Sequence, residues 1–323
     1  MGMGRYVAKR IATSILTFFG TLVLTFILFR LLPGNPVTIL FRNPQLTHAQ
    51  IVLLAQQFGL DKPLWVQFLL FVENVFKGNW GISFFYRAPV TSVLFPDLLN
   101  SIILLLPATI IAILIGVGLG ILSGWKRNSK TDVGILTSSL VLYAIPTFWL
   151  GILFIMLVVR VGGLPVAGMV SIQASSGPPL VYLESLARHI LLPMTTLALV
   201  TLGQFTIIMR SSLLSELTED YVTAAYAKGM SGSRLLRKHI VPNALLPTVS
   251  IIAISIGTIV AGAVLTETVF SWPGVGSLIY DSIGRRDYPV LQGAFLIVAL
   301  FVIVANFVAD LVYAYLDPRV KYS

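Results

Sequence analysis

Six long intervals without a charged residue are the feature that most constrains how this 323-residue chain can fold. They cover residues 11 to 29, 98 to 125, 133 to 159, 190 to 209, 240 to 266 and 288 to 309. An α-helix needs about 20 mostly apolar residues to cross the hydrocarbon core of a bilayer, and each interval is close to that length or longer. None shows the strict alternation of a barrel strand, so we expect helices. The sequence predicts an all-α polytopic membrane protein with six transmembrane helices.

The distribution of positive charge sets the expected orientation. The net charge is +9, which by itself also occurs in proteins that bind nucleic acid. Threading the six spans with the N-terminus in the cytoplasm places most basic residues on that side. These are Arg5, Lys9, Arg10, Lys126, Arg127, Lys130, Arg210, Lys228, Arg234, Arg237, Lys238, Arg319 and Lys321. Because cytoplasmic loops are enriched in Lys and Arg, we expect both termini in the cytoplasm and no nucleic-acid partner.

The outer loops contain short elements of their own. Residues 47 to 60 predict a short capped helix. Residues 63 to 78 predict a second helix, with Pro at its start and Gly at its end, that is too short to span the bilayer. Residues 267 to 289 are rich in turn residues, and such irregular backbone is tolerated at membrane depth only beside protein or water.

Small residues and prolines within the apolar intervals predict how the helices pack. Gly116, Gly120 and Gly124 recur every four residues, which predicts a helix face that another helix approaches closely. Prolines in or at the edges of the spans predict kinks. They are Pro107, Pro146, Pro193 and Pro247.

Polar residues in or beside the spans are candidates for lining or gating a path through the membrane, because they are costly to place in lipid. They are Gln204, Arg210, Glu267, Asn306 and Asp310. The last two lie one helical turn apart and share a face. An interhelical hydrogen bond explains such residues as well as contact with a solute does, so the sequence leaves both interpretations open.

Catalytic and cofactor motifs are missing from the sequence. The chain has no GxxxxGK[ST], HExxH or GxSxG pattern and no cysteine. Its three histidines, His48, His189 and His239, are far apart and fall on both sides of the predicted membrane. We therefore expect no enzymatic activity, metal site or bound cofactor on this chain.

A basic stretch punctuated by glycine, residues 221 to 242, lies on the predicted cytoplasmic side. Gly229 is placed to end a first helix, and Ser231 or Ser233 to cap a second one. Pro242 is expected to end or kink that second helix before the fifth span. The apolar side chains of Leu235, Leu236 and Ile240 predict a short ridge surrounded by positive charge.

Three interpretations of this hairpin compete. A small face with an apolar ridge favours docking to a soluble partner. A helix, a turn and a basic helix are also typical of a DNA reader, but attachment to two spans argues against it. Contact with anionic lipid is the remaining alternative, and we place docking slightly ahead of it.

The same stretch resembles a known family. The sequences "TAAYAKG" (223 to 229) and "HIVP" (239 to 242) are similar to the EAA loop of permease subunits in bacterial and archaeal ABC importers. The version "DYVTAAYAKG" followed by "NALLP" resembles the dipeptide and oligopeptide branch, as do "FGLDKP", "IPTFWLGIL", "ETVFSWPGVG" and "RRDYPVLQG" in the same order. Thr223, His239 and Val241 depart from the general motif and match that branch.

The resemblance implies a type I importer permease fold and a set of partners. It implies that the hairpin forms a coupling helix seated on an ATPase subunit. The residues assigned to that contact are Tyr221, Thr223, Ala224, Ala225, Lys228, Gly229, Arg234, His239, Pro242 and Asn243. It further implies a second homologous permease subunit, two ATPase subunits that bind ATP and Mg, and an extracytoplasmic solute-binding protein.

The resemblance also divides the chain into regions. Residues 1 to 32 form the cytoplasmic N-terminus and first span, and 33 to 97 an extracytoplasmic subdomain. Residues 98 to 318 form the core, with the coupling loop at 211 to 242, and 319 to 323 a cytoplasmic tail. Peptides are the expected substrate. Oligosaccharides, nickel chelates and, in another class, an ATP-independent channel or ion-coupled carrier remain alternatives.

Overall fold

The computed structural model describes residues 3–31, 47, 49, 52 and 62–316 of the chain. Within these ranges the secondary structure is helical, apart from an isolated antiparallel bridge between Ile82 and Pro89. The predicted elements at 47 to 60 and 319 to 323 fall almost wholly outside the described residues. The all-α prediction is confirmed for the described part.

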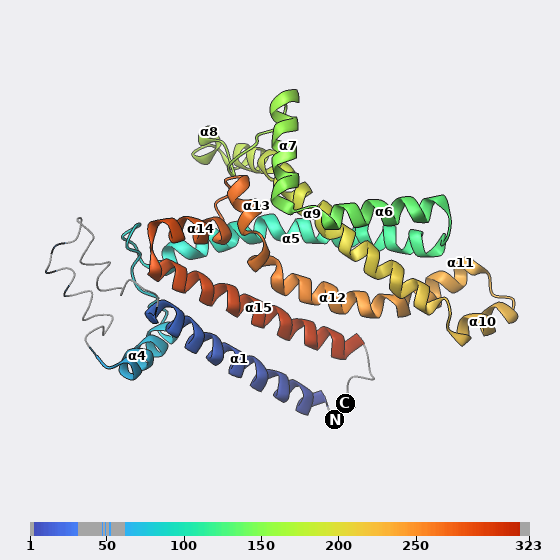
Figure 1. Ribbon diagram of the computed structural model, residues 1–323, viewed down its shortest axis with the longest axis horizontal. Coiled ribbons are helices and arrows are strands. Elements are labelled where there is room, and N and C mark those ends of the chain that lie inside the picture. Colours follow the sequence, from blue (N-terminus) through green and yellow to red (C-terminus); the bar gives the residue numbers. More distant parts are fainter. Residues whose placement is uncertain (1–2, 32–46, 48, 50–51, 53–61, 317–323) are drawn as a thin grey trace.

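Figure 1 shows the described helices in chain order. Their bounds are α1 (Met3–Leu31), α4 (Leu64–Phe76), α5 (Val90–Trp125), α6 (Lys130–Ala144), α7 (Thr147–Val161), α8 (Ile172–Ser175), α9 (Pro179–Glu216), α10 (Asp220–Ala227), α11 (Gly232–Leu235), a π-helix η1 (Leu236–Ile240), α12 (Val241–Gly262), α13 (Val264–Val269), α14 (Val275–Arg285) and α15 (Tyr288–Leu316).

Four helices of the described residues are long and apolar enough to cross a membrane, and a fifth span is added if α6 and α7 are taken together. The four lie in α1, α5, α9 and α15, where spans are predicted. The predicted span at 240 to 266 corresponds to α12, of which several side chains lie outside the described set. The total of six spans therefore remains a prediction.

The predicted span at 133 to 159 is interrupted at Pro146, where a kink is predicted. Helix α6 ends at Ala144, α7 begins at Thr147, and the two are bent by 99°. Ile145, the residue before Pro146, is extended with φ −74° and ψ 128°, as expected because proline disfavours the helical conformation of its predecessor. Pro107, Pro193 and Pro247 by contrast lie inside helices that continue through them.

Helix α9 is the helix that approaches the predicted glycine stripe on α5. A Cβ added to Gly116 would lie 2.7 Å from the Leu202 carbonyl oxygen, and one added to Gly120 would lie 2.6 Å from Met209 Cβ. A Cβ on Gly124 would meet Leu213 Cδ2 at 2.8 Å. The close approach is confirmed, because side chains at these positions cannot fit without moving α9.

The N-terminal end of α1 lies beside the C-terminal end of α15. Arg10 Nη1 is 2.9 Å from Asp310 Oδ2, and the Tyr6 hydroxyl donates to the Asp310 carbonyl oxygen at 3.4 Å. The hairpin of α10 and α11 extends from the same end of the helix bundle (Figure 1). The described ends of α1 and α15 and the hairpin thus lie at one end of the bundle, and their side of the membrane remains a prediction.

At the opposite end, short elements are fixed to the long helices. Helix α4 begins after Pro63 and is followed by Gly78 at φ +74°, as predicted. The Asp287 carboxylate accepts hydrogen bonds from the Ser83 hydroxyl at 2.5 Å and from the Phe84 N–H at 3.2 Å. This carboxylate ties the segment after α4 to the start of α15.

Candidate coupling hairpin

The first helix of the hairpin ends at the predicted glycine. Gly229 has φ +79°, its N–H donates to the Tyr226 carbonyl at 2.9 Å, and the Met230 N–H donates to the Ala225 carbonyl at 3.1 Å. These two bonds satisfy carbonyls that a helix end leaves unpaired, and the left-handed conformation favours glycine. The prediction that Gly229 ends α10 is confirmed.

Helix α10 presents one face to solvent and buries the other. Thr223, Ala224 and Lys228 are exposed, and Ala225 is half-buried. Val222, only 3% exposed, packs with Met209 and other side chains of a buried cluster that joins α9, α10, α11 and α12. The exposed side carries Ala224, Ala227 and the Gly229 turn, next to the exposed side chain of Tyr226, so another surface can approach the backbone closely at the alanines and the turn.

The predicted apolar ridge is wrong as a docking element. Leu235 and Ile240 are fully buried in the same cluster, packed with Met209 and Leu213 of α9. Their apolar side chains are buried within this chain, so they are not available to a partner. They pack the second half of the hairpin against α9. Arg234 and His239 stay exposed beside them.

Pro242 does not end the second helix. Helix α11, the π-helix Leu236–Ile240 and α12 follow without a gap, and Pro242 stands in the first turn of α12. The Val241 N–H donates to the Leu236 carbonyl in this π turn, and Pro242, which has no N–H, follows directly after it. A π-helix closes bonds one residue wider than an α-helix, so the chain reaches α12 without a break. Pro242 and Asn243 are both exposed.

A tyrosine connects the two ends of the hairpin. The Tyr221 hydroxyl donates to Glu216 Oε2 at 2.7 Å and accepts from Asn243 Nδ2 at 3.4 Å. Partial burial raises the pKa of the Tyr221 phenol above its ordinary value. The hydrogen bonds link the end of α9 to the start of α12, so the hairpin is fixed at its base.

The hairpin also contacts the end of α5. Trp125, the last residue of α5, lies 3.4 Å from the position of a Cβ on Gly232. Val117, Ile121 and Trp125 pack against the buried cluster that holds Val222. The hairpin therefore contacts α5 as well as α9.

The five candidate path residues do not form one site. Gln204 is half-buried on α9 and Asn306 is exposed on α15. Asp310 pairs with Arg10, and Arg210 pairs with Asp132 on α6, with 2.7 Å between Arg210 Nε and Asp132 Oδ1. Arg210 and Asp310 therefore have protein partners, and a role of these residues in a path remains a prediction.

Glu267 is fully buried and caps a helix. Its carboxylate accepts from the Ser101 hydroxyl at 2.7 Å and from the Gly276 and Ser277 N–H groups at 2.7 and 3.1 Å. Burial raises the pKa of this carboxyl, whereas the three hydrogen bonds act in the opposite direction. Glu267 thus joins α5, α13 and the N-terminus of α14, where a negative charge is favourable.

Sequence reasoning missed several polar residues that the fold brings together. Asp132, Ser123 and Ser101 are buried at 3%, 0% and 0% exposure. One signal for Asp132 is present in the sequence: it is the only acidic residue in the basic turn "KRNSKTD" (126 to 132), three residues after Ser129. Ser101 and Ser123 carry no such signal, because serine is common in transmembrane helices.

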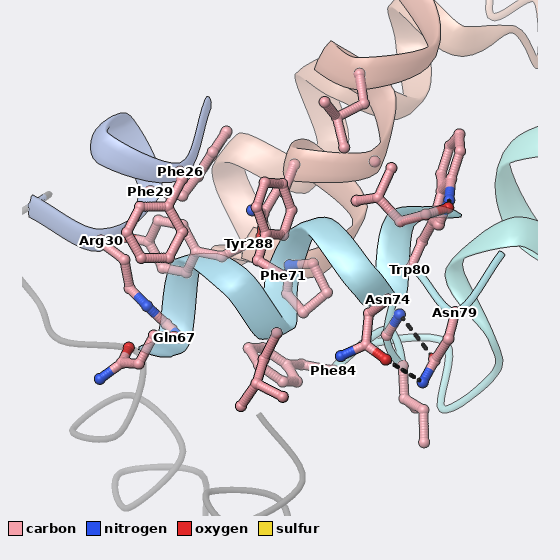
Figure 2. A pocket seen from close by; sticks show the side chains of 18 residues that line it. Phe26, Phe29, Arg30, Gln67, Phe71, Asn74, Asn79, Trp80, Phe84 and Tyr288 are labelled. Atoms are coloured by element: carbon pink, nitrogen blue, oxygen red, sulfur yellow. Dashed lines mark hydrogen bonds between the residues drawn. The ribbon is translucent and has the colours of Figure 1, made fainter. Parts of the chain in front are cut away.

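A cavity of about 440 Å³ lies near the other end of the bundle (Figure 2). Its wall combines aromatic side chains of α1, α4 and α15, including Phe29, Phe71 and Tyr288, with amide side chains. Asn79 Nδ2 donates to Asn74 Oδ1 at 3.4 Å on one side of it. The cavity is remote from the hairpin and shares no residue with it.

A bundle of long apolar helices with an exposed hairpin at one end defines a class: a polytopic, mostly helical membrane protein. The comparisons identify the family within that class. Residues 116–322 match the family described as "Binding-protein-dependent transport system inner membrane component", and residues 3–110 match its N-terminal membrane component. The chain belongs to this family of transport permeases.

Named relatives match it along nearly their whole length. It is 40% identical to the "Di/tripeptide transport system permease protein DppB" of Pseudomonas aeruginosa, covering 98% of this chain and 99% of the relative. It is 34% identical to the "Oligopeptide transport system permease protein AppB" of Bacillus subtilis and 36% identical to the "Dipeptide transport system permease protein DppB" of Escherichia coli. These two alignments cover 99% of this chain and 100% of each relative.

Proposed function

We propose that this chain is a permease subunit of an ATP-driven importer of dipeptides or oligopeptides. One observation supports coupling to an ATPase: α10 is exposed on one side and packs against the long helices on the other. Its exposed face offers Thr223, Ala224 and the Gly229 turn to a partner, while Val222 on the other face packs on the long helices. The relatives named for peptide transport support peptides as the substrate class.

The partners follow from this assignment. Two ATPase subunits bind ATP and Mg, and one of them seats the exposed face of α10. A second homologous permease supplies the other half of the path, and an extracytoplasmic binding protein delivers the peptide. The basic residues around the hairpin contact the ATPase or the lipid surface.

Reconstitution tests the proposal. The chain is co-produced with the ATPase subunits, second permease and binding protein of a candidate transport system from the same genome, and the purified complex is placed in proteoliposomes. We expect uptake of a labelled dipeptide that needs ATP and the binding protein. Uptake of an oligosaccharide or a nickel chelate in its place would refute the peptide assignment, and uptake without ATP would favour a channel or ion-coupled carrier.

A matched pair of variants tests the docking face. Ala224→Leu adds bulk at the centre of the exposed face and is expected to reduce co-purification of the ATPase. Ala12→Leu makes the same change at an exposed site of α1, near the same end of the bundle. It is expected to leave co-purification unchanged. Equal recovery of the ATPase with both variants would refute the assignment of α10.

A further inference from the structure

The turn between α5 and α6 is held by one buried carboxylate. Asp132 is 3% exposed. It accepts a hydrogen bond from the Ser123 hydroxyl at 2.5 Å and one from the Asn128 N–H at 3.0 Å. Ser123 belongs to the last turn of α5, and Asp132 to the first turn of α6. The carboxylate therefore joins the adjacent ends of two helices.

A third helix is attached to the same carboxylate. Arg210 of α9 donates from Nε to Asp132 Oδ1 at 2.7 Å and from Nη2 to Asp132 Oδ2 at 2.8 Å. The two parallel bonds fix the orientation of α9 relative to α6 as well as the distance between them, which a single point contact would not do. The side chain of Arg210 is 20% exposed and that of Asp132 is 4% exposed.

Association of these helices does not depend on the ion pair. Helices α5 and α9 are already in backbone contact at Gly116, Gly120 and Gly124. Helices α6 and α9 meet at Gly203, where a Cβ would lie 2.5 Å from the Ser139 carbonyl oxygen. A buried ion pair contributes little net stability, because removing both charges from water costs about as much as their attraction returns. The Arg210–Asp132 pair therefore matters for the orientation of the helices that it joins, more than for the free energy of folding.

Arg210 occupies the stretch of α9 that touches the hairpin. Its neighbours Met209 and Leu213 pack in the cluster that holds Val222 of α10. One side of this stretch thus contacts the hairpin, and another side holds Asp132 through Arg210. The hairpin thus touches α9 and the end of α5 directly, whereas Arg210 and Asp132 connect this stretch of α9 to α6.

We propose that Asp132 and Arg210 are a positioning pair that passes displacement of the hairpin to α6 and to the turn that joins α6 to α5. The inference rests on the proposed function, because it assumes that an ATPase moves the hairpin. Neither residue touches nucleotide or transported solute in this scheme. Their loss uncouples ATP hydrolysis from transport while the complex still assembles.

Two variants test the pair without leaving a buried charge alone. Arg210→Lys keeps the positive charge but cannot make two parallel bonds, so the orientation is no longer fixed. The double variant Asp132→Asn with Arg210→Gln replaces both charges by neutral hydrogen-bonding groups. Arg10→Lys is the matched control, because Arg10 forms an ion pair with Asp310 between α1 and α15, away from the hairpin.

The measurements are ATPase co-purification, the ATP hydrolysis rate, and peptide uptake per ATP hydrolysed in proteoliposomes. We expect the first two to be retained and uptake per ATP to fall about tenfold in both test variants, within the usual range of allosteric coupling. Arg10→Lys should leave the ratio unchanged. The ratio is informative because a merely structural defect lowers hydrolysis and uptake together.

The outcomes separate two failures. If the wild-type complex transports peptide with ATP and both test variants keep the wild-type ratio, the positioning pair is refuted and the proposed function stands. Proportional loss of hydrolysis and uptake, or loss of assembly in both variants, also refutes the pair, because either result assigns it a structural role. A wild-type complex without ATP-dependent uptake refutes the proposed function and this inference with it.

Discussion

Replacement of Gly229 tests whether coupled transport depends on the backbone conformation of the hairpin turn. The φ angle of Gly229 is +79°, and no heavy atom lies within 4 Å of an added Cβ, so a side chain meets no steric obstacle there. The cost is therefore conformational. A left-handed residue with a Cβ costs roughly 1–2 kcal/mol relative to glycine, asparagine costs less, and a β-branched residue is a stronger outlier.

The expected order of damage follows from these costs. Gly229→Asn should retain most coupled transport, Gly229→Ala should lose part of it, and Gly229→Val should lose most. A penalty of about 1.4 kcal/mol reduces the ratio of native to distorted hairpin conformations tenfold. Because α10 ends with bonds from Gly229 and Met230 to the helix, distortion here moves its exposed face.

The assay is peptide uptake per ATP hydrolysed in proteoliposomes. Gly134→Val is the control, because Gly134 lies within α6 with an open Cβ position and no positive φ. We expect this control to keep wild-type coupling. The reasoning is refuted if Gly229→Val transports as well as wild type, or if Asn is tolerated less well than Val.

Three further predictions concern stability. Gly120→Ala should destabilise the detergent-solubilised protein by about 1–3 kcal/mol in thermal unfolding, because its Cβ would lie 2.6 Å from Met209 Cβ; Gly118→Ala, where nothing lies within 4 Å, should not, and equal effects would contradict the predicted contact. Glu267→Ala leaves the Ser101 hydroxyl and two backbone N–H groups of α14 without their acceptor. This variant should unfold at a lower temperature than Glu267→Gln, which keeps an acceptor oxygen, and the reverse order would argue against the cap. Tyr221→Phe removes the 2.7 Å bond to Glu216 and should cost about 0.5–1.5 kcal/mol, seen as faster amide exchange at the start of α10; unchanged exchange would show that packing alone holds the hairpin.

Local patterns were enough to predict several elements. The four spans in α1, α5, α9 and α15 follow from uninterrupted apolar sequence, which has few alternatives to a membrane helix. The end of α10 at Gly229 follows from the conformational freedom of glycine. The contact along Gly116, Gly120 and Gly124 follows from helical periodicity, although the sequence did not reveal that α9 is the partner.

Other features depended on tertiary contacts that periodicity does not encode. The bend at Pro146 and the continuous helices at Pro107 and Pro193 come from the same residue type, so proline alone could not distinguish them. Leu235 and Ile240 alternate with charges on an exposed hairpin, yet they are buried because α9 extends beside them. The partner of Arg210 lies on another helix, at Asp132.

The direct contact of α5 and α9 provides a reference distance within this molecule. Glycine at positions 116, 120 and 124 lets α9 lie directly against the backbone of α5, so the two helices cannot come closer without a clash. The chain contains no cysteine, so labels can be placed one pair at a time. A spin-label pair across α5 and α9 should report the same distance in every nucleotide state. Movements of α1, α12 or α15 can then be measured against that fixed length.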